Sequence, residues 1–313
     1  MKYIIGLFMI VFLWSCSQPA KQAPYKPIVD VYNTPKGDKI IFLDDYYRSY
    51  LKAIKAGNKN YDSLYKADIS GPIQSGYFSK CEYSQYVGSE FRYPIVDTTG
   101  LKYYTFAIKK NEGRIDSIIT DALVVANKFL KNDSITILIQ PSNYYNRAMM
   151  RKMGGVYAFT AGSKQILIAI DTTVHSWQEV LKYCVAHEFN HTYWTKMKYN
   201  KSTPFTLLDW MILEGRADTY ADMLYPDNKS PWTMALTEQE KIDLWKRLQP
   251  NLQSEDQTLQ HDVMFGSDTY PQWGGYTLGF NIVQSALRNH PELKPLEWAT
   301  MDPKKILEMS NYK

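Results

Sequence analysis

Two histidines and a glutamate form the pattern with the clearest chemistry in this sequence. They occupy an HExxH motif, His187-Glu188-Phe189-Asn190-His191. On a helix, residues i and i+4 lie one turn apart on the same face, so both imidazoles can bind one metal ion. Glu188 lies beside them, where it can accept a proton from water but cannot easily become a third ligand. The spacing therefore predicts a zinc site with Glu188 as a catalytic carboxylate.

A zinc site of this kind needs a third protein ligand, which leaves a fourth position for water. Glu214 is the best candidate, because it lies on a second predicted helix that is far enough along the chain to return antiparallel to the first. Asp218 follows one turn later, where it could orient a ligand histidine through its free ring nitrogen. The alternative for Glu214 is a solvated helix carboxylate. The metzincin pattern is excluded, because Trp194 and Met197 stand where it needs glycine and histidine.

Hydrophobic spacing and capping residues predict the elements that must position these side chains. The HExxH motif falls in a helix from Ser176 to about Trp194, which opens with a capping box of Ser176 and Glu179. The Glu214 helix is expected to start at Thr203-Pro204 and to end near 224. Further helices are predicted over 115–129, from a Thr237–Glu240 capping box, over 276–289 and from 302. Strands are predicted over 134–139, 155–160 and 165–170, the last two as a hairpin.

The first fifteen residues follow a secretion pattern, with Lys2, an apolar run and then Ser15 before Cys16. Leu13-Trp14-Ser15-Cys16 resembles the lipobox of bacterial lipoproteins. This resemblance implies cleavage before Cys16 and acylation of its new N-terminus, which would hold the protein at a membrane. We therefore expect a lipid-anchored protein of the bacterial cell envelope, on the periplasmic or outer-membrane face. The alternative is an ordinary signal peptide with an incidental cysteine.

The HExxH motif followed by a helix with Glu-x-x-x-Asp resembles the gluzincins, the thermolysin-like branch of zinc metallopeptidases. A narrower likeness covers about residue 101 to the C-terminus. Val185-Ala186-His187-Glu188, the ILEGRAD segment of 212–218 and the GYTLG segment of 275–279 are similar to a bacterial family of predicted zinc-dependent proteases of unassigned role. This likeness implies a zincin-like fold in which the 115–129 helix backs a small sheet. Asn190 replaces the aromatic or histidine of many relatives, which leaves the pocket wall open to question.

The predicted fold class is α+β and mainly helical, with a small sheet and an HExxH active-site helix. We expect a signal peptide over 1–15, an extended tether over 16–36, a helical N-terminal region over 37–99 and a zincin-like metallopeptidase domain over 100–313. The 36 Lys and Arg against 32 Asp and Glu give a net charge of +4 without a basic, aromatic-rich stripe, so nucleic acid is not an expected partner. Cys184 is expected as a buried free thiol. The sequence does not indicate an oligomeric state.

The predicted activity is zinc-dependent hydrolysis of a peptide or protein substrate. Zinc would polarise the scissile carbonyl, while Glu188 would carry a proton from water to the leaving amine. Tyr276 is our hypothesis for a second donor to the developing oxyanion, and the alternative is a core tyrosine. His261 is a weaker candidate for that task, whereas His175 and His290 are expected at the surface near helix ends.

The strand over 165–170 is predicted to offer an exposed edge to an extended peptide. Two other functions stay open on the sequence alone. One is an envelope-assembly or interaction lipoprotein that has inherited a zincin fold without proteolytic activity. The other is hydrolysis of a different amide, such as a cell-wall cross-link. A glutamate beside both ligand histidines favours an enzyme, because a structural zinc site does not need it.

Overall fold

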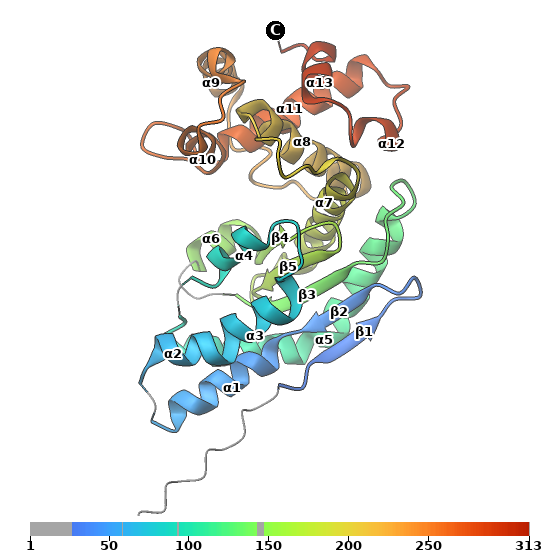
Figure 1. Cartoon of the computed structure of the whole chain (residues 1–313). Coiled ribbons are helices and arrows are strands. Elements are labelled where there is room, and N and C mark those ends of the chain that lie inside the picture. Colours follow the sequence, from blue (N-terminus) through green and yellow to red (C-terminus); the bar gives the residue numbers. More distant parts are fainter. Residues whose placement is uncertain (1–26, 58, 93, 143–146, 313) are drawn as a thin grey trace, which may run out of the picture.

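The computed structural model describes residues 27–57, 59–92, 94–142 and 147–312 (Figure 1). The predicted signal peptide, Cys16 and most of the predicted tether lie outside these residues. Five strands form one sheet and many helices surround it, which confirms the predicted α+β, mainly helical class. None of the helices in the described ranges is both long enough and apolar enough to cross a bilayer.

The sheet is mixed, with the strand order β1-β2-β3-β5-β4. Its three central strands are parallel, and the two edge strands are antiparallel to their neighbours. The prediction that the 165–170 strand has an exposed edge is wrong, because β5 pairs on both sides and β4 forms the edge instead. The strands are β1 (Asp30–Asn33), β2 (Lys39–Phe42), β3 (Thr136–Pro141), β4 (Val156–Thr160) and β5 (Gln165–Ile170).

The two N-terminal strands correct the predicted chain organisation. Strand β1 falls within the expected tether, and β2 falls within the region expected to be helical. Strand β2 pairs in parallel with β3, in a register that places Ile41 opposite Leu138. The sheet therefore joins the N-terminal region to the part of the chain that carries the HExxH motif.

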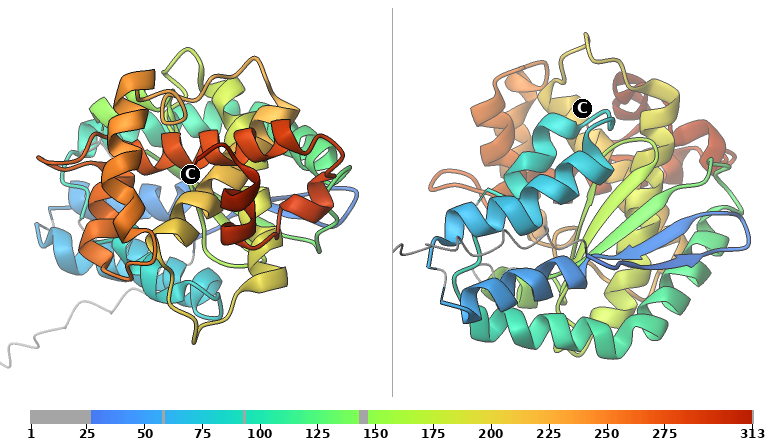
Figure 2. Two further views of the ribbon diagram at one scale, coloured as in Figure 1. Left: turned by 90° about the horizontal axis from the view of Figure 1, so that it is seen from above. Right: turned by 60° about the horizontal axis from the view of Figure 1, so that its bottom comes forward.

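Helices cover both faces of the sheet, as the two further views in Figure 2 show. On one face, Ile137, Ile139 and Ile168 pack against α5 (Thr98–Ala126) and α7 (Trp177–Lys198). On the other face, Leu138 and Leu167 pack against the N-terminal helices. Side chains alternate between the faces of a strand, so covering both faces explains why these strands are continuously apolar.

The N-terminal helices form the layer on the second face. They are α1 (Asp44–Lys55), α2 (Tyr61–Tyr65), α3 (Gly71–Ile73) and α4 (Ser84–Glu90), with the π-helical turns η1 (Lys66–Ser70) and η2 (Gln74–Phe78) between them. A short helix α6 (Arg147–Lys152) precedes β4. Cys81 and Cys184 are both buried and free, as expected for Cys184.

The C-terminal helices gather at the other end of the molecule, beyond α7 (Figure 1). The backbones of two of them touch: a Cβ added to Gly215 would lie 2.2 Å from the carbonyl oxygen of Gly279. Only glycine permits this approach between α8 and α11. These helices are α8 (Leu207–Leu224), α9 (Glu238–Leu248), α10 (Gln257–Phe265), α11 (Gly274–Asn289), α12 (Pro295–Trp298) and α13 (Pro303–Met309).

Most predicted helix positions are confirmed, but some of their first residues are not. The capping box of Thr237 is present at α9. Helix α8 begins at Leu207 rather than at 204, because Thr206 and Asp209 form its capping box. The capping box predicted at Ser176 is absent, since its backbone is not extended and its hydroxyl points to the carbonyl of Gly154. Helix α5 has 29 residues and begins at Thr98, well before the predicted start.

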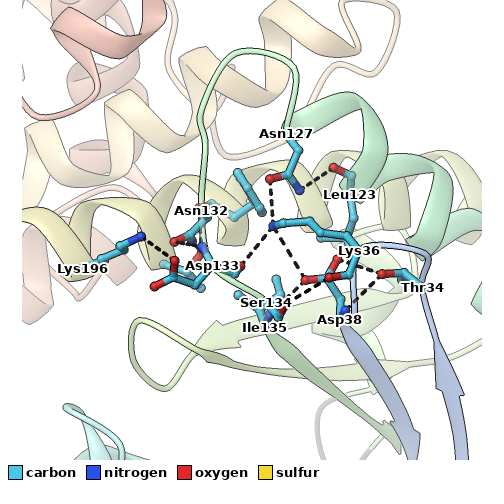
Figure 3. A network of polar contacts seen from close by, with 12 residues as sticks. Thr34, Lys36, Asp38, Leu123, Asn127, Asn132, Asp133, Ser134, Ile135 and Lys196 are labelled. Atoms are coloured by element: carbon cyan, nitrogen blue, oxygen red, sulfur yellow. Dashed lines mark hydrogen bonds and ion pairs between the residues drawn. The ribbon is translucent and has the colours of Figure 1, made fainter.

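A polar network fixes α7 relative to the sheet (Figure 3). Lys36, in the β1–β2 turn, donates hydrogen bonds to Oδ1 of Asn127 (2.9 Å) and to the carbonyl of Asp133 (3.1 Å). Lys196 of α7 pairs with the Asp133 carboxylate at 2.9 Å. The turn, the segment after α5 and α7 are therefore held together.

Candidate metal centre

Three ligand atoms converge between the antiparallel helices α7 and α8. Nε2 of His187 and Nε2 of His191 lie 3.0 Å apart, because the two residues are one helical turn apart. Oε2 of Glu214 lies 3.2 Å from the first nitrogen and 3.3 Å from the second. All three side chains are buried. The structure thus brings together the three residues that the sequence singled out as ligands.

The spacing of these atoms fits zinc. Imidazole nitrogens and carboxylate oxygens about 2.0–2.1 Å from a tetrahedral ion stand about 3.3 Å from one another. The observed separations of 3.0, 3.2 and 3.3 Å are close to that value. Two imidazoles and one carboxylate are also a donor set that catalytic zinc uses. The residues present therefore suit a zinc ion with one coordination position left open.

Asp218 contacts the metal-facing histidine from behind. Its Oδ1 lies 3.0 Å from Nδ1 of His187, which is the arrangement expected from the spacing of Glu214 and Asp218. The same oxygen accepts hydrogen bonds from Tyr183 (3.0 Å) and from Nε1 of Trp232 (2.8 Å). The carboxylate is completely buried. When Nδ1 of His187 donates to Asp218, its Nε2 lone pair is free for a metal ion.

Glu188 is held by a residue of the edge strand. The hydroxyl of Thr160, near the end of β4, donates to Oε2 of Glu188 at 2.6 Å. Both side chains are buried. This contact keeps the carboxylate against β4, beside the two histidines and not between them. Its position agrees with the predicted role as a base rather than a ligand.

The centre is strongly negative. Burial lowers the pKa of His187, but the carboxylates of Asp218, Glu214 and Glu188 outweigh it and raise this pKa well above its ordinary value. Burial raises the pKa of Glu214, but His191 and His187 outweigh that effect and lower it. Among the described residues, no lysine or arginine forms an ion pair with any of these carboxylates. A bound cation would balance their charge.

Comparison with protein families gives independent information about this part of the chain. One family model matches residues 115–308, more than half of the chain, and its description reads Predicted Zn-dependent protease (DUF2268). The chain belongs to this family. No curated protein and no solved structure matches the chain. The matched region includes α7 and α8, and the zinc in the family's description agrees with the donor set found between them.

The phenol of Tyr276, on α11, is influenced by the charges of the candidate metal centre. Burial raises the pKa of its phenol well above the ordinary value, and the negative charges of Glu214 and Asp218 raise it further. Its ring meets that of Phe265 edge to face at 6.0 Å. No hydrogen bond joins its hydroxyl to a described residue. The role of Tyr276 in catalysis stays a prediction.

The other histidines do not join the centre. His261 is exposed and contacts Phe265. His175 is exposed, and His290 is paired with Glu292 at the surface. The weaker hypothesis that His261 serves the oxyanion thus gains no support from its position.

Asn190, the residue at which the chain departs from many relatives, is fully buried. Neither its amide nitrogen nor its amide oxygen has a hydrogen-bond partner among the described residues. The side chain is therefore part of the interior beside His191. It does not form a wall of an open pocket.

Sequence reasoning missed three polar contacts of the candidate metal centre. They are made by Thr160 to Glu188, and by Tyr183 and Trp232 to Asp218. Tyr183 precedes His187 by one helical turn, so its helical spacing carried a signal that it faces the same side. Thr160 and Trp232 carried no local signal, because they reach the centre through tertiary packing alone.

Proposed function

We propose that this chain is a zinc-dependent peptidase, with His187, His191 and Glu214 as ligands and Glu188 as general base. The observation that carries the proposal is the pairing of two features in one place. Three donor atoms of the right types stand at zinc-ligand spacing, and a fourth carboxylate is held beside them by its own hydrogen bond. A bound zinc would act as a Lewis acid on the scissile carbonyl and lower the pKa of a water molecule.

Each side chain of the centre then has a task. Glu188 accepts a proton from the attacking water and returns it to the leaving amine. Thr160 keeps the Glu188 carboxylate in one orientation, so that little reorganisation is needed when the proton moves. Asp218 fixes the ring of His187 and its protonation at Nδ1. Burial of all these groups excludes bulk water and strengthens their electrostatic effects.

Edge strand β4 supports a peptide as the substrate. The backbone N–H of Asp171 donates to the carbonyl of Gly155, and the N–H of Ala161 donates to the carbonyl of Gln165. At these positions the backbone groups of the β4 segment point toward β5. By the alternation of an antiparallel ladder, the backbone N–H and C=O of Ala158 point outward. An extended peptide could pair with these groups beside Thr160 and Glu188.

The decisive experiment compares the wild type with Glu188→Gln. Zinc per chain is measured in both, and both are assayed on a broad peptide library. Equal zinc with cleavage only by the wild type supports the proposal. A wild type that binds zinc but cleaves nothing in the library favours the interaction lipoprotein. Cleavage by the variant at the wild-type rate would remove Glu188 from the mechanism.

We also propose that the protein is attached to the bacterial cell envelope through acylated Cys16. The support is the secretion pattern and the lipobox-like segment of the sequence. The test is fractionation of cells that express the wild type or Cys16→Ser. The wild type should sediment with membranes and the variant should not. Equal release of both would refute the anchor.

A further inference from the structure

A buried arginine on α8 forms no close ion pair with a described residue. Arg216 is 1% exposed, yet no described carboxylate lies within 4.0 Å of its guanidinium. Of its five N–H donors, Nη1 forms a hydrogen bond to the carbonyl of Met301 (2.6 Å), and Nε is buried without any partner. Burial lowers the pKa of Arg216 to about 10, although Asp209 and Asp302 act against this from beyond ion-pair distance. Arg216 lies two residues after Glu214 on α8. Residues two apart on a helix do not share a face, so Arg216 does not face the metal centre.

Arg216 lines a cavity of about 220 Å³. The cavity lies between the end of α7, the α7–α8 loop, α8 and the segment before α13. Lys198 supplies a second cation. Trp194 forms an apolar wall, with its ring centre 5.9 Å from the guanidinium carbon.

Two carboxylates also line the cavity, and one oxygen of each caps the start of a helix. Asp209 accepts hydrogen bonds from the backbone N–H and the hydroxyl of Thr206, as the capping box of α8. Asp302 accepts from the backbone N–H of Lys304, as the N-cap of α13. Each thus stabilises the start of a helix and does not form an ion pair with Arg216.

We propose that this cavity binds a small anion, a carboxylate or a phosphate, on Arg216 and Lys198. The planar guanidinium binds two oxygen atoms of such a group side by side, and an ammonium adds a point charge. The cavity volume limits the ligand to an anionic group with few attached atoms. Bound there, the anion accepts hydrogen bonds from guanidinium donors that no described residue uses, and it holds α8, the helix of Glu214, against the segment before α13. This site is separate from the proposed peptidase centre.

The test uses thermal unfolding of the purified full chain in sodium acetate or sodium phosphate, against sodium chloride at equal ionic strength. At a hundredfold excess over Kd, either anion that binds should raise Tm by about 5 °C. A rise with acetate alone identifies a carboxylate site, and a rise with phosphate alone identifies a phosphate site. No rise with either anion would overturn the proposal.

Variants locate the anion. The increase in Tm should be lost in both Arg216→Met and Lys198→Met. Because Lys198 is exposed, its variant still tests the proposal if Arg216→Met fails to fold. Lys196→Met is the matched control, since Lys196 is on the same helix but pairs with Asp133 outside the cavity, and it should keep the increase. Glu214→Gln should also keep it, which separates this site from zinc-bound anions. Loss in Glu214→Gln, or an unchanged increase in Lys198→Met, would contradict the assignment.

Discussion

The carboxylate of Asp218 lies 3.0 Å from Nδ1 of His187, on the side of the ring away from Glu214. The pair links the second turn of the Glu-x-x-x-Asp segment to the first histidine of the HExxH motif. One helix thus supplies both a proposed ligand, Glu214, and the carboxylate that orients a proposed ligand of the other helix. A hydrogen bond from a ligand histidine to a carboxylate raises the basicity of the imidazole and fixes the orientation of its ring.

Asp218→Asn should weaken zinc binding while leaving the fold in place. The amide keeps the shape of the carboxylate but loses its charge, so we expect about a 10- to 100-fold rise in the Kd for zinc. Competition with a chelating dye measures this Kd. Asp222→Asn, one turn further along α8 and paired with exposed Lys229, is the control and should bind like the wild type. An unchanged Kd in Asp218→Asn would mean that the contact does not tune the site.

Glu214→Gln should abolish stoichiometric zinc binding. A neutral amide is a poor substitute for a carboxylate ligand, and two imidazoles alone hold zinc weakly. Metal analysis after dialysis should give about one zinc per wild-type chain and far less for the variant. The control is Glu179→Gln, which changes an exposed glutamate at the start of α7. Full zinc occupancy in Glu214→Gln would exclude Glu214 as the third ligand.

Thr160→Val should reduce turnover without reducing zinc content. The substitution removes the 2.6 Å hydrogen bond to Glu188 but keeps the size of the side chain. Hydrogen bonds to charged groups are worth about 1.5–3 kcal/mol, so we expect kcat to fall about 10- to 100-fold. Thr160→Ser retains the hydroxyl and should retain most of the activity. Equal loss in Thr160→Ser and Thr160→Val would point to packing instead of the hydrogen bond.

Tyr276→Phe should lower turnover with little change in zinc per chain, because it removes only a hydroxyl that is not a proposed zinc ligand. Loss of one oxyanion donor typically costs about 10²–10³ in kcat. Steady-state kinetics on a cleaved library peptide gives the comparison. A kcat equal to that of the wild type would remove Tyr276 from the mechanism and leave it as a core tyrosine.

Gly215→Ala should destabilise the protein. The added Cβ would lie 2.2 Å from the carbonyl oxygen of Gly279, so α8 and α11 would have to separate, at a cost on the order of 3 kcal/mol. Chemical denaturation measures the loss. Gly113→Ala is the control: it lies within α5 with nothing inside 4 Å, and we expect about 0.5–1 kcal/mol of stabilisation. Equal stability of Gly215→Ala and the wild type would show that the helices can separate freely.

The parts of this molecule that were predictable from the sequence depend on local geometry. His187 and His191 converge because any helix brings i and i+4 together. The start of α9 follows from a capping box that Thr237 and Glu240 complete within one turn. Even Glu214, on a different helix, could be predicted from the sequence, because a short loop forces α8 to return along α7.

Tertiary packing alone decided the rest. The sequence marked the 165–170 segment as a strand, but its place inside the sheet depends on parallel pairing with β3 in addition to the hairpin partner β4, and local spacing does not specify that pairing. Thr160 reaches Glu188 across 28 residues of sequence because β4 packs along α7. Hydrophobic patterns specify which residues are buried, but not which buried residues meet. The chain's local spacing therefore determined the ligand set, and the packing of helices on the sheet decided which polar groups orient those ligands and the base.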